Sequence, residues 1–584
     1  MIIPLPQYLR FLLDYLKPQR RRVLLLAALL LSGIGLQLVN PQIIRYFLDA
    51  VQSGRAESAW LMAAGMYLGF ALVQQAARLA ASVVSQNVAW TATNALRRDL
   101  TLHCLRLDLP FHKEHTPGEL IERVDGDTTE LSIFFSEFAI HVLGNGLLTS
   151  GILVLLYRED WRVGAGLTLY VAVTLALLNA AQNAAVKRWA EARQASAEHY
   201  GFIEERLVGA EDLRANGAVP YSLYRLQQRM RRFLEKYRAA YTLQTVVMNF
   251  TNLLAVTGYA VGLGLGVYLF TRGEVSLGTA YLIVNYTAML SEPLQNIRRQ
   301  LQNLQQAAAS LNRIQELLAL QPQVRDRAGA RPLSPGPLAV EFEDVEFSYE
   351  GNGRTRSLHG VSFQLRHGKV LGVLGRTGSG KTTLTRLLFH LYDPASGAVK
   401  INGADLRDVP LDDLRARVGM VTQEVQLFKA TLRDNLAFFN RRLGDAHIEQ
   451  ALRDLRLWDW FQKLPAGLDT QLETGGRGLS AGEAQLLAFA RVFLRDPGLV
   501  ILDEASSRLD PATEALLERG IDRLLANRTG LVIAHRLQTV QRADDILILD
   551  NGRVAEFGPR EELVANPASR FSQLLKTGLE EVLA

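Results

Sequence analysis

Hydrophobic and polar positions divide the chain into two halves of different character. Up to about residue 315, long apolar runs follow one another, and each is about long enough to cross a hydrocarbon core of ~30 Å. These candidate spans lie near Val23–Val51, Ala59–Val84, Phe134–Leu156, Val163–Ala185, Val246–Phe270 and Leu277–Leu301. The pattern predicts an α-helical membrane domain. The remainder of the chain reads as an ordinary soluble α/β domain.

The helical pattern does not stop where two of these runs end. Strongly polar sequence continues it through residues 94–111 after the second span and through residues 187–207 after the fourth. Continuous helices of that length must project beyond the bilayer. The short segments Thr116–Asp127 and Val208–Ala218 stand at the turning points of these projections.

Basic residues beside the first apolar run indicate its orientation. Lys17–Arg22 immediately precedes that run, and cations mark the cytoplasmic side of a spanning helix. We therefore expect a multi-pass protein of the cell (inner) membrane, with the projections and the second half in the cytoplasm. The competing interpretation is a solvated basic face on a soluble helix. The first 16 residues lack the features of a cleavable signal peptide, and they predict an amphipathic elbow helix lying on the membrane.

The second half begins after a change in composition. Leu320–Pro337 is rich in Pro, Gly and Arg, as linkers are. Beyond it, strands and helices alternate in an α/β nucleotide-binding pattern. The predicted organisation is a membrane domain at 1–319, a linker at 320–337 and a nucleotide-binding domain at 338–584. A net charge of +5 on 584 residues gives no reason to expect nucleic acid as a partner, and one cysteine excludes an intrachain disulfide.

A glycine-rich loop between a strand and a helix predicts a phosphate site. The sequence GRTGSGKTT follows the apolar strand VLGVL and opens a helical segment. Its glycines allow backbone N–H groups to approach phosphates, its lysine reaches the β/γ oxygens, and the threonine after it ligates Mg²⁺. The candidate nucleotide-binding residues are Gly375, Arg376, Thr377, Gly378, Ser379, Gly380, Lys381, Thr382 and Thr383, with Thr382 also a metal ligand.

Polar residues follow three further strands. Asp503 and Glu504 end the strand LVIL, and we expect Asp503 to act on the Mg²⁺ shell while Glu504 polarises the attacking water. His535 follows the strand GLVIA and is a candidate sensor of the γ-phosphate. Gln423, after another strand, is placed to reach Mg²⁺ or water. Taken singly, each of these residues could instead have a purely structural role at the end of its strand.

A second stretch suited to an anion lies far downstream. In LSAGEAQ, Leu479–Gln485, a Ser, a small residue and a Gly open a probable helix. Tyr349, before a turn, is a candidate to stack on adenine. The ordered set of Tyr349, GRTGSGKTT, Gln423, LSAGEAQ, LVILDE, SSRLD and His535 resembles the ATPase domain of an ABC transporter. With the spans in front, the whole chain resembles a half-transporter of the ABC exporter type.

The resemblance implies how the two phosphate-binding stretches are used. In that family the signature, usually written LSGGQ, binds the γ-phosphate held by the phosphate loop of the opposite subunit, so two ATP molecules with Mg²⁺ are buried in a head-to-tail dimer. Ser480, Gly482 and Asp510 would then bind nucleotide across the interface. Thr116–Asp127 and Val208–Ala218 resemble the coupling helices that dock on the ATPase domains.

The signature segment departs from the family pattern. Ala481 replaces the first Gly, Glu483 replaces the Gln, and Arg508 stands in the following loop where a small residue is usual. A carboxylate near a polyphosphate is repulsive unless it is screened. The phosphate-loop side is intact, and this asymmetry predicts a heterodimer with a second ABC half-transporter. A homodimer that tolerates the altered signature is the alternative.

The predicted function is ATP-driven export of an amphipathic or hydrophobic substrate, such as a drug, lipid or peptide, by alternating access. The alternative is a nucleotide-gated membrane regulator or channel. A soluble ATPase of DNA repair or translation is excluded by the spans. Membrane lipid is a further expected partner. Candidate cavity residues are Gln74, Arg78, Asn179, Asn183, Asn249, Asn252, Tyr259, Asn285 and Tyr286.

Overall fold

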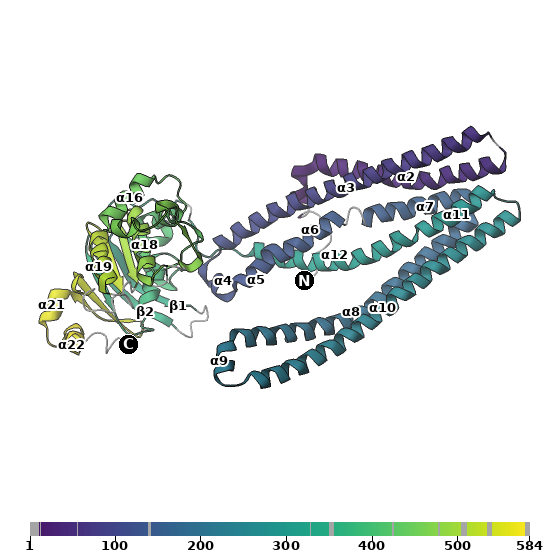
Figure 1. The fold of residues 1–584 in the computed structure, drawn as a ribbon. Coiled ribbons are helices and arrows are strands. Elements are labelled where there is room, and N and C mark those ends of the chain that lie inside the picture. Colours follow the sequence, from purple (N-terminus) through teal and green to yellow (C-terminus); the bar gives the residue numbers. More distant parts are fainter. Residues whose placement is uncertain are drawn as a thin grey trace. The chain divides into compact units, whose positions relative to one another are not determined.

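The computed structural model describes residues 11, 13–54, 56–137, 142–327, 329–349, 356–422, 425–476, 479–503, 511–533 and 540–577. These residues fold into two compact units, shown as a ribbon in Figure 1. The membrane unit contains residues 1–105 and 117–320. The ATPase unit contains residues 321–584 together with the short segment Arg106–Thr116.

The membrane unit is built of long helices. In chain order they are α2 (Arg20–Gln52), α3 (Glu57–Arg106), α5 (Pro117–Ile121), α6 (Asp127–Glu137), α7 (Asn145–Glu159), α8 (Trp161–Val208), α9 (Ala210–Ala215), α10 (Val219–Thr271), α11 (Leu277–Met289) and α12 (Ser291–Ala319). A π-helical turn, η2 (Glu122–Gly126), joins α5 to α6. Helices α8 and α10 run side by side over most of their length, and α9 closes the turn between them (Figure 1).

Five helical segments of the described chain are long and apolar enough to cross a membrane: Leu13–Gln52, Glu57–Arg106, Pro117–Glu159, Trp161–Leu178 and Val219–Thr271. They match the first five predicted runs. The sixth, Leu277–Leu301, is divided at Leu290 into α11 and the more polar α12. Pro293 explains the break, because proline has no N–H to continue the hydrogen-bond ladder of α11.

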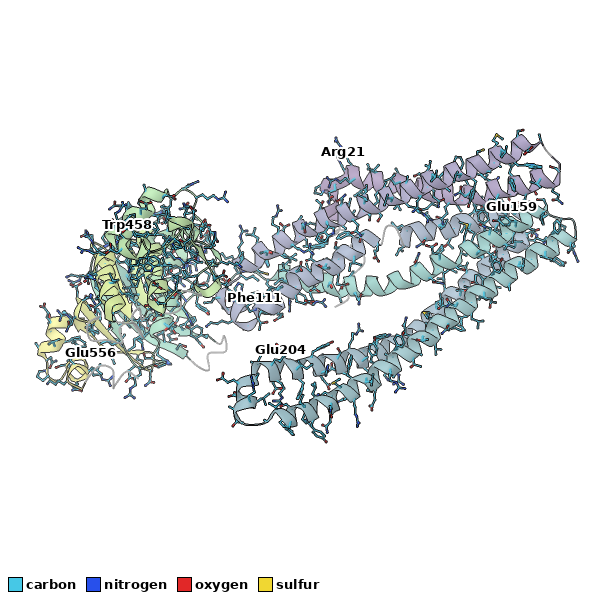
Figure 2. The ribbon with its side chains drawn as sticks, viewed as in Figure 1. Arg21, Phe111, Glu159, Glu204, Trp458 and Glu556 are labelled. Atoms are coloured by element: carbon cyan, nitrogen blue, oxygen red, sulfur yellow. The ribbon has the colours of Figure 1, made fainter. Side chains whose placement is uncertain are left out.

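Polar contacts fix the ends of these helices. Asp160 caps α8 by accepting from the backbone N–H of Arg162 at 2.7 Å. Arg45 of α2 pairs with Glu159 at the end of α7, with 2.6 Å between Nη1 and Oε1 (Glu159 is labelled in Figure 2). Asp49 of α2 accepts from the backbone N–H of Gly278 in the first turn of α11 at 3.0 Å. Such contacts satisfy charges and helix-end groups that lipid cannot.

The ATPase unit contains a parallel sheet with one antiparallel edge strand. Its order is β12-β11-β3-β10-β9-β6. The strands are β3 (Val370–Leu374), β6 (Val418–Val421), β9 (Leu499–Asp503), β10 (Thr529–Ile533), β11 (Asp545–Asp550) and β12 (Arg553–Pro559). A second, antiparallel sheet has the order β2-β1-β4-β5, with β1 (Val340–Ser348), β2 (Arg356–Leu365), β4 (Ser396–Ile401) and β5 (Ala404–Asp405). A hairpin pairs β7 (Ala430–Thr431) with β8 (Gln471–Leu472).

Helices cover the sheets and add a helical subdomain. They are α13 (Lys381–Leu388), α14 (Leu411–Arg417), α15 (Leu432–Ala437), α16 (Asp445–Asp454), α17 (Trp458–Phe461), α18 (Ala481–Leu494), α19 (Pro511–Leu525), α21 (Arg560–Ala565) and α22 (Arg570–Thr577). One apolar core joins the two sheets with α13, and a second joins α15, α16 and α18 to β9. α18, which begins within the signature segment, therefore packs directly on the central sheet.

The segment predicted as a linker is packed on the ATPase unit. Leu333 is buried in the first apolar core. The backbone N–H of Leu338 donates to the carbonyl of Gly498 at 3.3 Å, and that of Arg331 donates to the carbonyl of Asp408 at 3.0 Å. The chain from Gln321 onward thus belongs to the compact ATPase unit rather than forming a free tether.

Candidate nucleotide site

The phosphate loop adopts the backbone that its glycines predict. Gly375, Gly378 and Gly380 have φ of +151°, +83° and +105°, values that favour glycine. A Cβ on Gly375 would lie 2.4 Å from the carbonyl oxygen of Leu549, so the chain cannot accept a side chain there. Gly380 is the N-cap of α13, which points its first backbone N–H groups toward the loop.

Lys381 lies inside the loop. Its Nζ donates to the carbonyl oxygens of Gly375 at 2.5 Å and Arg376 at 3.1 Å, and its side chain is buried. The Oγ of Ser379 is buried and has no hydrogen-bond partner in the described part of the chain. Thr382 is exposed and Thr383 is buried. A buried cation, an unpartnered hydroxyl and N–H groups at a helix start form a cradle that fits a polyphosphate.

The strands β3, β6, β9 and β10 bring their carboxyl ends to one edge. Asp503 of β9 is in register with Ile533 of β10, which pairs with Val373 of β3. Val421 of β6 pairs with Leu502. Glu504, His535, Gln423 and Asp510 lie outside the described residues. Glu504 directly follows Asp503, and His535 and Gln423 each stand two residues beyond the described strand end.

Tyr349 is surrounded by polar and aromatic groups. Its hydroxyl contacts Thr383 Oγ1 at 3.1 Å and accepts from Arg386 at 3.0 Å. The Tyr392 ring meets it edge-on at 5.3 Å between centroids. Lys113 Nζ lies 4.6 Å from the centroid of the Tyr349 ring, a cation–π contact. The ring therefore lies beside Thr383 of the phosphate-loop motif with a cation close to it, and its stacking on adenine stays a prediction.

Lys113 comes from a short, separate helix. The helix predicted to continue through residue 111 ends at Arg106, and a new one begins at Leu109 because Pro110 cannot continue the first. α4 (Leu109–Glu114) lies in Arg106–Thr116, which clusters with the ATPase unit. Leu109 packs on the first apolar core, and Asp108 accepts from the backbone N–H of Val324 at 3.4 Å. Burial, with the nearby Arg386 charge, lowers the pKa of the Lys113 ammonium.

The coupling segment expected at Thr116–Asp127 overlaps the segment packed in the ATPase unit only at Thr116. It forms α5, η2 and the first residue of α6 in the membrane unit instead. Phe111, at the centre of α4, is labelled in Figure 2. Its ring stacks on that of His115, the residue that follows α4, with 4.4 Å between centroids.

The signature segment opens α18 with a capping box. The backbone N–H of Glu483 donates to Ser480 Oγ at 3.2 Å, and Glu483 Oε2 accepts from the backbone N–H of Ser480 at 2.7 Å. Glu483 Oε1 accepts from the indole Nε1 of Trp460 in α17 at 2.7 Å. Both oxygens of the altered signature residue are therefore engaged with this chain's own groups. Ser480 is exposed and Gly482 is buried.

A half-buried arginine connects α18 to the segment that follows β6. Arg491 donates to the carbonyl of Gln426 at 2.8 Å and to the carbonyl and Oδ1 of Asn435, each at 2.7 Å. Asn435 is fully buried, and its amide donates to the carbonyls of Phe428 and Thr431. Burial lowers the pKa of the Arg491 guanidinium to about 10. Nothing in the motif pattern identified this network, since its members are 56 residues apart.

The predicted cavity residues of the membrane unit differ in their surroundings. Tyr286 is fully buried, and its hydroxyl donates to the carbonyl of Leu38 at 2.7 Å, so it is a core residue rather than part of a cavity lining. Gln74 accepts from Asn40 at 2.8 Å. Arg78 lines a cavity, and Asn249 lines a hollow along one side of α10. Asn252 and Tyr259 are exposed, Asn285 donates to Tyr281, and the side chains of Asn179 and Asn183 are not described.

Comparisons with known proteins agree along the whole chain. Residues 23–294 match the family model of the ABC transporter transmembrane region, and residues 358–507 match that of the ABC transporter. An uncharacterized ABC transporter ATP-binding protein of Bacillus subtilis, YfiC, is 30% identical over 98% of this chain and 94% of its own length. The human mitochondrial iron–sulfur clusters transporter ABCB7 is 30% identical over 97% of this chain and 78% of its own.

The fold matches a solved structure as well. A bacterial Atm1-family ABC exporter with ATP bound superposes with a TM-score of 0.82 at 24% identity, covering 96% of this chain and 98% of that one. The matched regions place the ATP-hydrolysing domain after a multi-pass membrane domain, on the cytoplasmic side of the membrane. This chain is therefore a member of the ABC transporter family, an exporter-type half-transporter that couples ATP hydrolysis to transport.

Proposed function

We propose that this chain is one half of a heterodimeric exporter of amphipathic substrates, in which its own phosphate loop forms the competent ATP site. Lys381 and the backbone of the loop bind the β- and γ-phosphates, and Tyr349 stacks on adenine. Thr382, Asp503 and Gln423 would hold Mg²⁺, which neutralises phosphate charge when bound. Glu504 orients and polarises the attacking water, and His535 contacts the γ-phosphate. Ser480, Gly482 and Asp510 serve the nucleotide held by the partner.

The proposal rests on the negative charge and the hydrogen bonds of Glu483. An α-helix N-terminus attracts anions with a charge equivalent to about +0.5. In α18 a full carboxylate lies in the first turn, and it occupies the backbone N–H of Ser480. This signature therefore offers a partner's γ-phosphate a weaker field than one with a neutral residue there. A chain that combines a weak signature with an intact phosphate loop is expected when the two ATP sites of a dimer differ.

Native mass spectrometry of the complex purified through a tag on this chain tests the assembly. A heterodimer contains one chain of 64.8 kDa and a second chain of different mass. We expect the partner to carry a regular signature and to lack a carboxylate equivalent to Glu504. An ATP-hydrolysing dimer of twice 64.8 kDa would overturn the proposal.

Glu504→Gln tests the assignment of the base. The amide retains the size of the side chain and loses its ability to polarise water, so we expect ATP binding to persist and turnover to fall at least about 10²-fold. Asp503→Asn is the comparison, because it disturbs Mg²⁺-dependent nucleotide binding instead. Steady hydrolysis by the Glu504→Gln complex would show that another group acts as the base.

Transport is measured directly with inverted vesicles. ATP-dependent accumulation of a fluorescent amphipath against its gradient supports export. ATP-dependent conductance that only dissipates a gradient would support the nucleotide-gated regulator or channel instead.

A further inference from the structure

A cavity of about 320 Å³ lies among four helices of the membrane unit. Its volume is at the lower end of the range for small-molecule sites. The apolar part is formed mainly by Leu29, Leu30 and Ile34 of α2 and Leu148 of α7. Gly33 also lines it, and a Cβ there would meet no atom within 4 Å, so this side of the cavity is open space.

The polar part of the cavity contains two opposite charges. Arg78 of α3 donates to Gln37 Oε1 of α2 at 2.6 Å, which uses one of the five N–H donors of its guanidinium. Glu292 of α12 lines the same cavity, and its carboxylate has no hydrogen bond or ion pair with the described residues. Asn145 and Asn296 also line the cavity.

Charges on membrane-spanning helices are costly where they face lipid, and those that occur line wet cavities and mark substrate or ion pathways. Here the cation and the anion line one cavity, and no ion pair joins them in the described structure. Gln37 is eight residues from Leu29 along α2, so the polar and apolar parts extend over about 12 Å at ~1.5 Å per residue. The lining is complementary to a short zwitterion attached to an apolar chain.

We propose that this cavity binds the headgroup of a zwitterionic amphipath, with Arg78 and Gln37 holding its anionic group and Glu292 holding its ammonium group. Leu29, Leu30 and Ile34 contact the first methylenes of the apolar chain. This inference rests on the proposed export of amphipathic substrates and names the charge class of the substrate.

The test uses four probes that share a twelve-carbon chain: dodecylamine, dodecanoate, monolauroylglycerol and lauroyl-lysophosphatidylethanolamine. The purified full complex is reconstituted, and probe-stimulated ATP hydrolysis is measured. We expect the zwitterionic probe to act at a concentration about tenfold lower than the other three. Glu292→Gln should shift the preference to dodecanoate, because only the cation remains, and Arg78→Gln should shift it to dodecylamine. The double variant should prefer the neutral probe.

Two controls separate charge recognition from damage to the fold. Ser82→Ala alters a neutral residue of the same cavity, and Glu57→Gln removes an exposed carboxylate from the first turn of α3. Both should keep the zwitterion preference. Arg78 and Glu292 are exposed on the chain, so melting temperatures of their variants should stay near that of the parent.

An unchanged order of the four probes in Glu292→Gln and Arg78→Gln would overturn the proposal. So would a parent complex that responds equally to all four. Uptake into inverted vesicles distinguishes this failure from failure of the export proposal. If ATP-dependent uptake is the same in the parent and in both charge variants, the export proposal holds and the proposed site is wrong. If ATP hydrolysis is stimulated according to the charge of the probe but no probe is taken up, the proposed site holds and the export proposal is wrong.

Discussion

The carboxylate of Glu483 accepts two hydrogen bonds at once, which makes Glu483→Gln an informative change. Oε1 accepts from Trp460 Nε1 and Oε2 accepts from the backbone N–H of Ser480, each at 2.7 Å. An amide has one acceptor oxygen, and its NH₂ group only donates. Because the two donors bind different oxygens of the carboxylate, the single glutamine oxygen can take the place of only one of them. The side chain then serves the capping box or the indole, but not both.

The cost follows from the burial of the two partners. Losing a hydrogen bond to a charged group costs ~1.5–3 kcal/mol when it is buried. Trp460 and Glu483 are half-buried, so water replaces part of the lost interaction, and the expected cost is about 1.5 kcal/mol. At ~2–4 °C per kcal/mol for a domain of ~150–250 residues, the melting transition of the ATPase unit should fall by about 3–6 °C.

A double-mutant cycle with Trp460→Phe tests this reasoning in the full complex. The phenylalanine ring retains much of the packing and removes the N–H donor, so the glutamine oxygen is free for the Ser480 N–H. Glu483→Gln should then cost at least about 1 kcal/mol less than it does beside tryptophan. Thermal unfolding followed by intrinsic fluorescence measures all four proteins. Equal losses in the two backgrounds would refute the claim that one carboxylate serves both donors.

Three further changes have distinct expected outcomes. Asn435→Ala removes the Oδ1 that accepts from half-buried Arg491 and the amide that donates to the carbonyls of Phe428 and Thr431, while the backbone carbonyl of residue 435 remains as an acceptor. The change should cost about 3 kcal/mol, measured as a loss of melting temperature larger than that of Glu483→Gln. Gly278→Ala places a Cβ 2.6 Å from a backbone oxygen of α2 and should destabilise the membrane unit by about 1–3 kcal/mol, whereas Gly264→Ala, with no atom within 4 Å, should be tolerated. Lys113→Met removes the cation above the predicted adenine-stacking ring and should lower the half-saturating ATP concentration by about two- to fivefold in steady-state hydrolysis, since a cation–π contact is worth ~0.5–1 kcal/mol. An unchanged value would show that adenine and Lys113 do not compete.

Features set by local sequence were predictable. The glycines of the phosphate loop specify positive φ one residue at a time, and the structure has these values at Gly375, Gly378 and Gly380. The grouping of the polar residues that follow the strands was also predictable from local sequence. The carboxyl ends of parallel strands lie at the same edge of a sheet, so the residue after each strand reaches that edge. The register of Asp503 with Ile533 follows from it. The roles of Glu504, His535 and Gln423 stay predictions.

Two details of the helix boundaries follow from stop and start signals rather than from hydropathy. Pro293 lies within the predicted span Leu277–Leu301, and it marks the helix break that the structure has at Leu290. Pro110 lies in the first turn of α4 after Asp108, a common pattern at a helix start. That signal marks a helix start just before the expected coupling segment Thr116–Asp127, whose docking stays a prediction.

Contacts between distant segments were beyond sequence reasoning. The S-x-x-E pattern of Ser480 and Glu483 indicates a capping box by itself. The second acceptor of that carboxylate binds Trp460, 23 residues earlier in another helix, and only packing decides this. The sequence suggested a carboxylate facing a polyphosphate. In the structure the carboxylate is turned back to its own helix, so its effect on a partner's nucleotide is a weaker field rather than a direct contact.

Because Glu483 acts on the nucleotide held by the other subunit, measurements of nucleotide binding can distinguish a homodimer from a heterodimer. In a homodimer both composite sites would contain the same signature, and Glu483→Gln would strengthen both, so one class of ATP sites would remain one class with higher affinity. In a heterodimer the altered signature serves only the nucleotide held by the partner. Two classes of sites should then be present, and Glu483→Gln should shift only one of them. An ATP-binding isotherm is measured in the Glu504→Gln background, where hydrolysis does not consume the ATP. The number of classes of ATP sites, and which class changes its affinity in Glu483→Gln, distinguish the homodimer from the heterodimer.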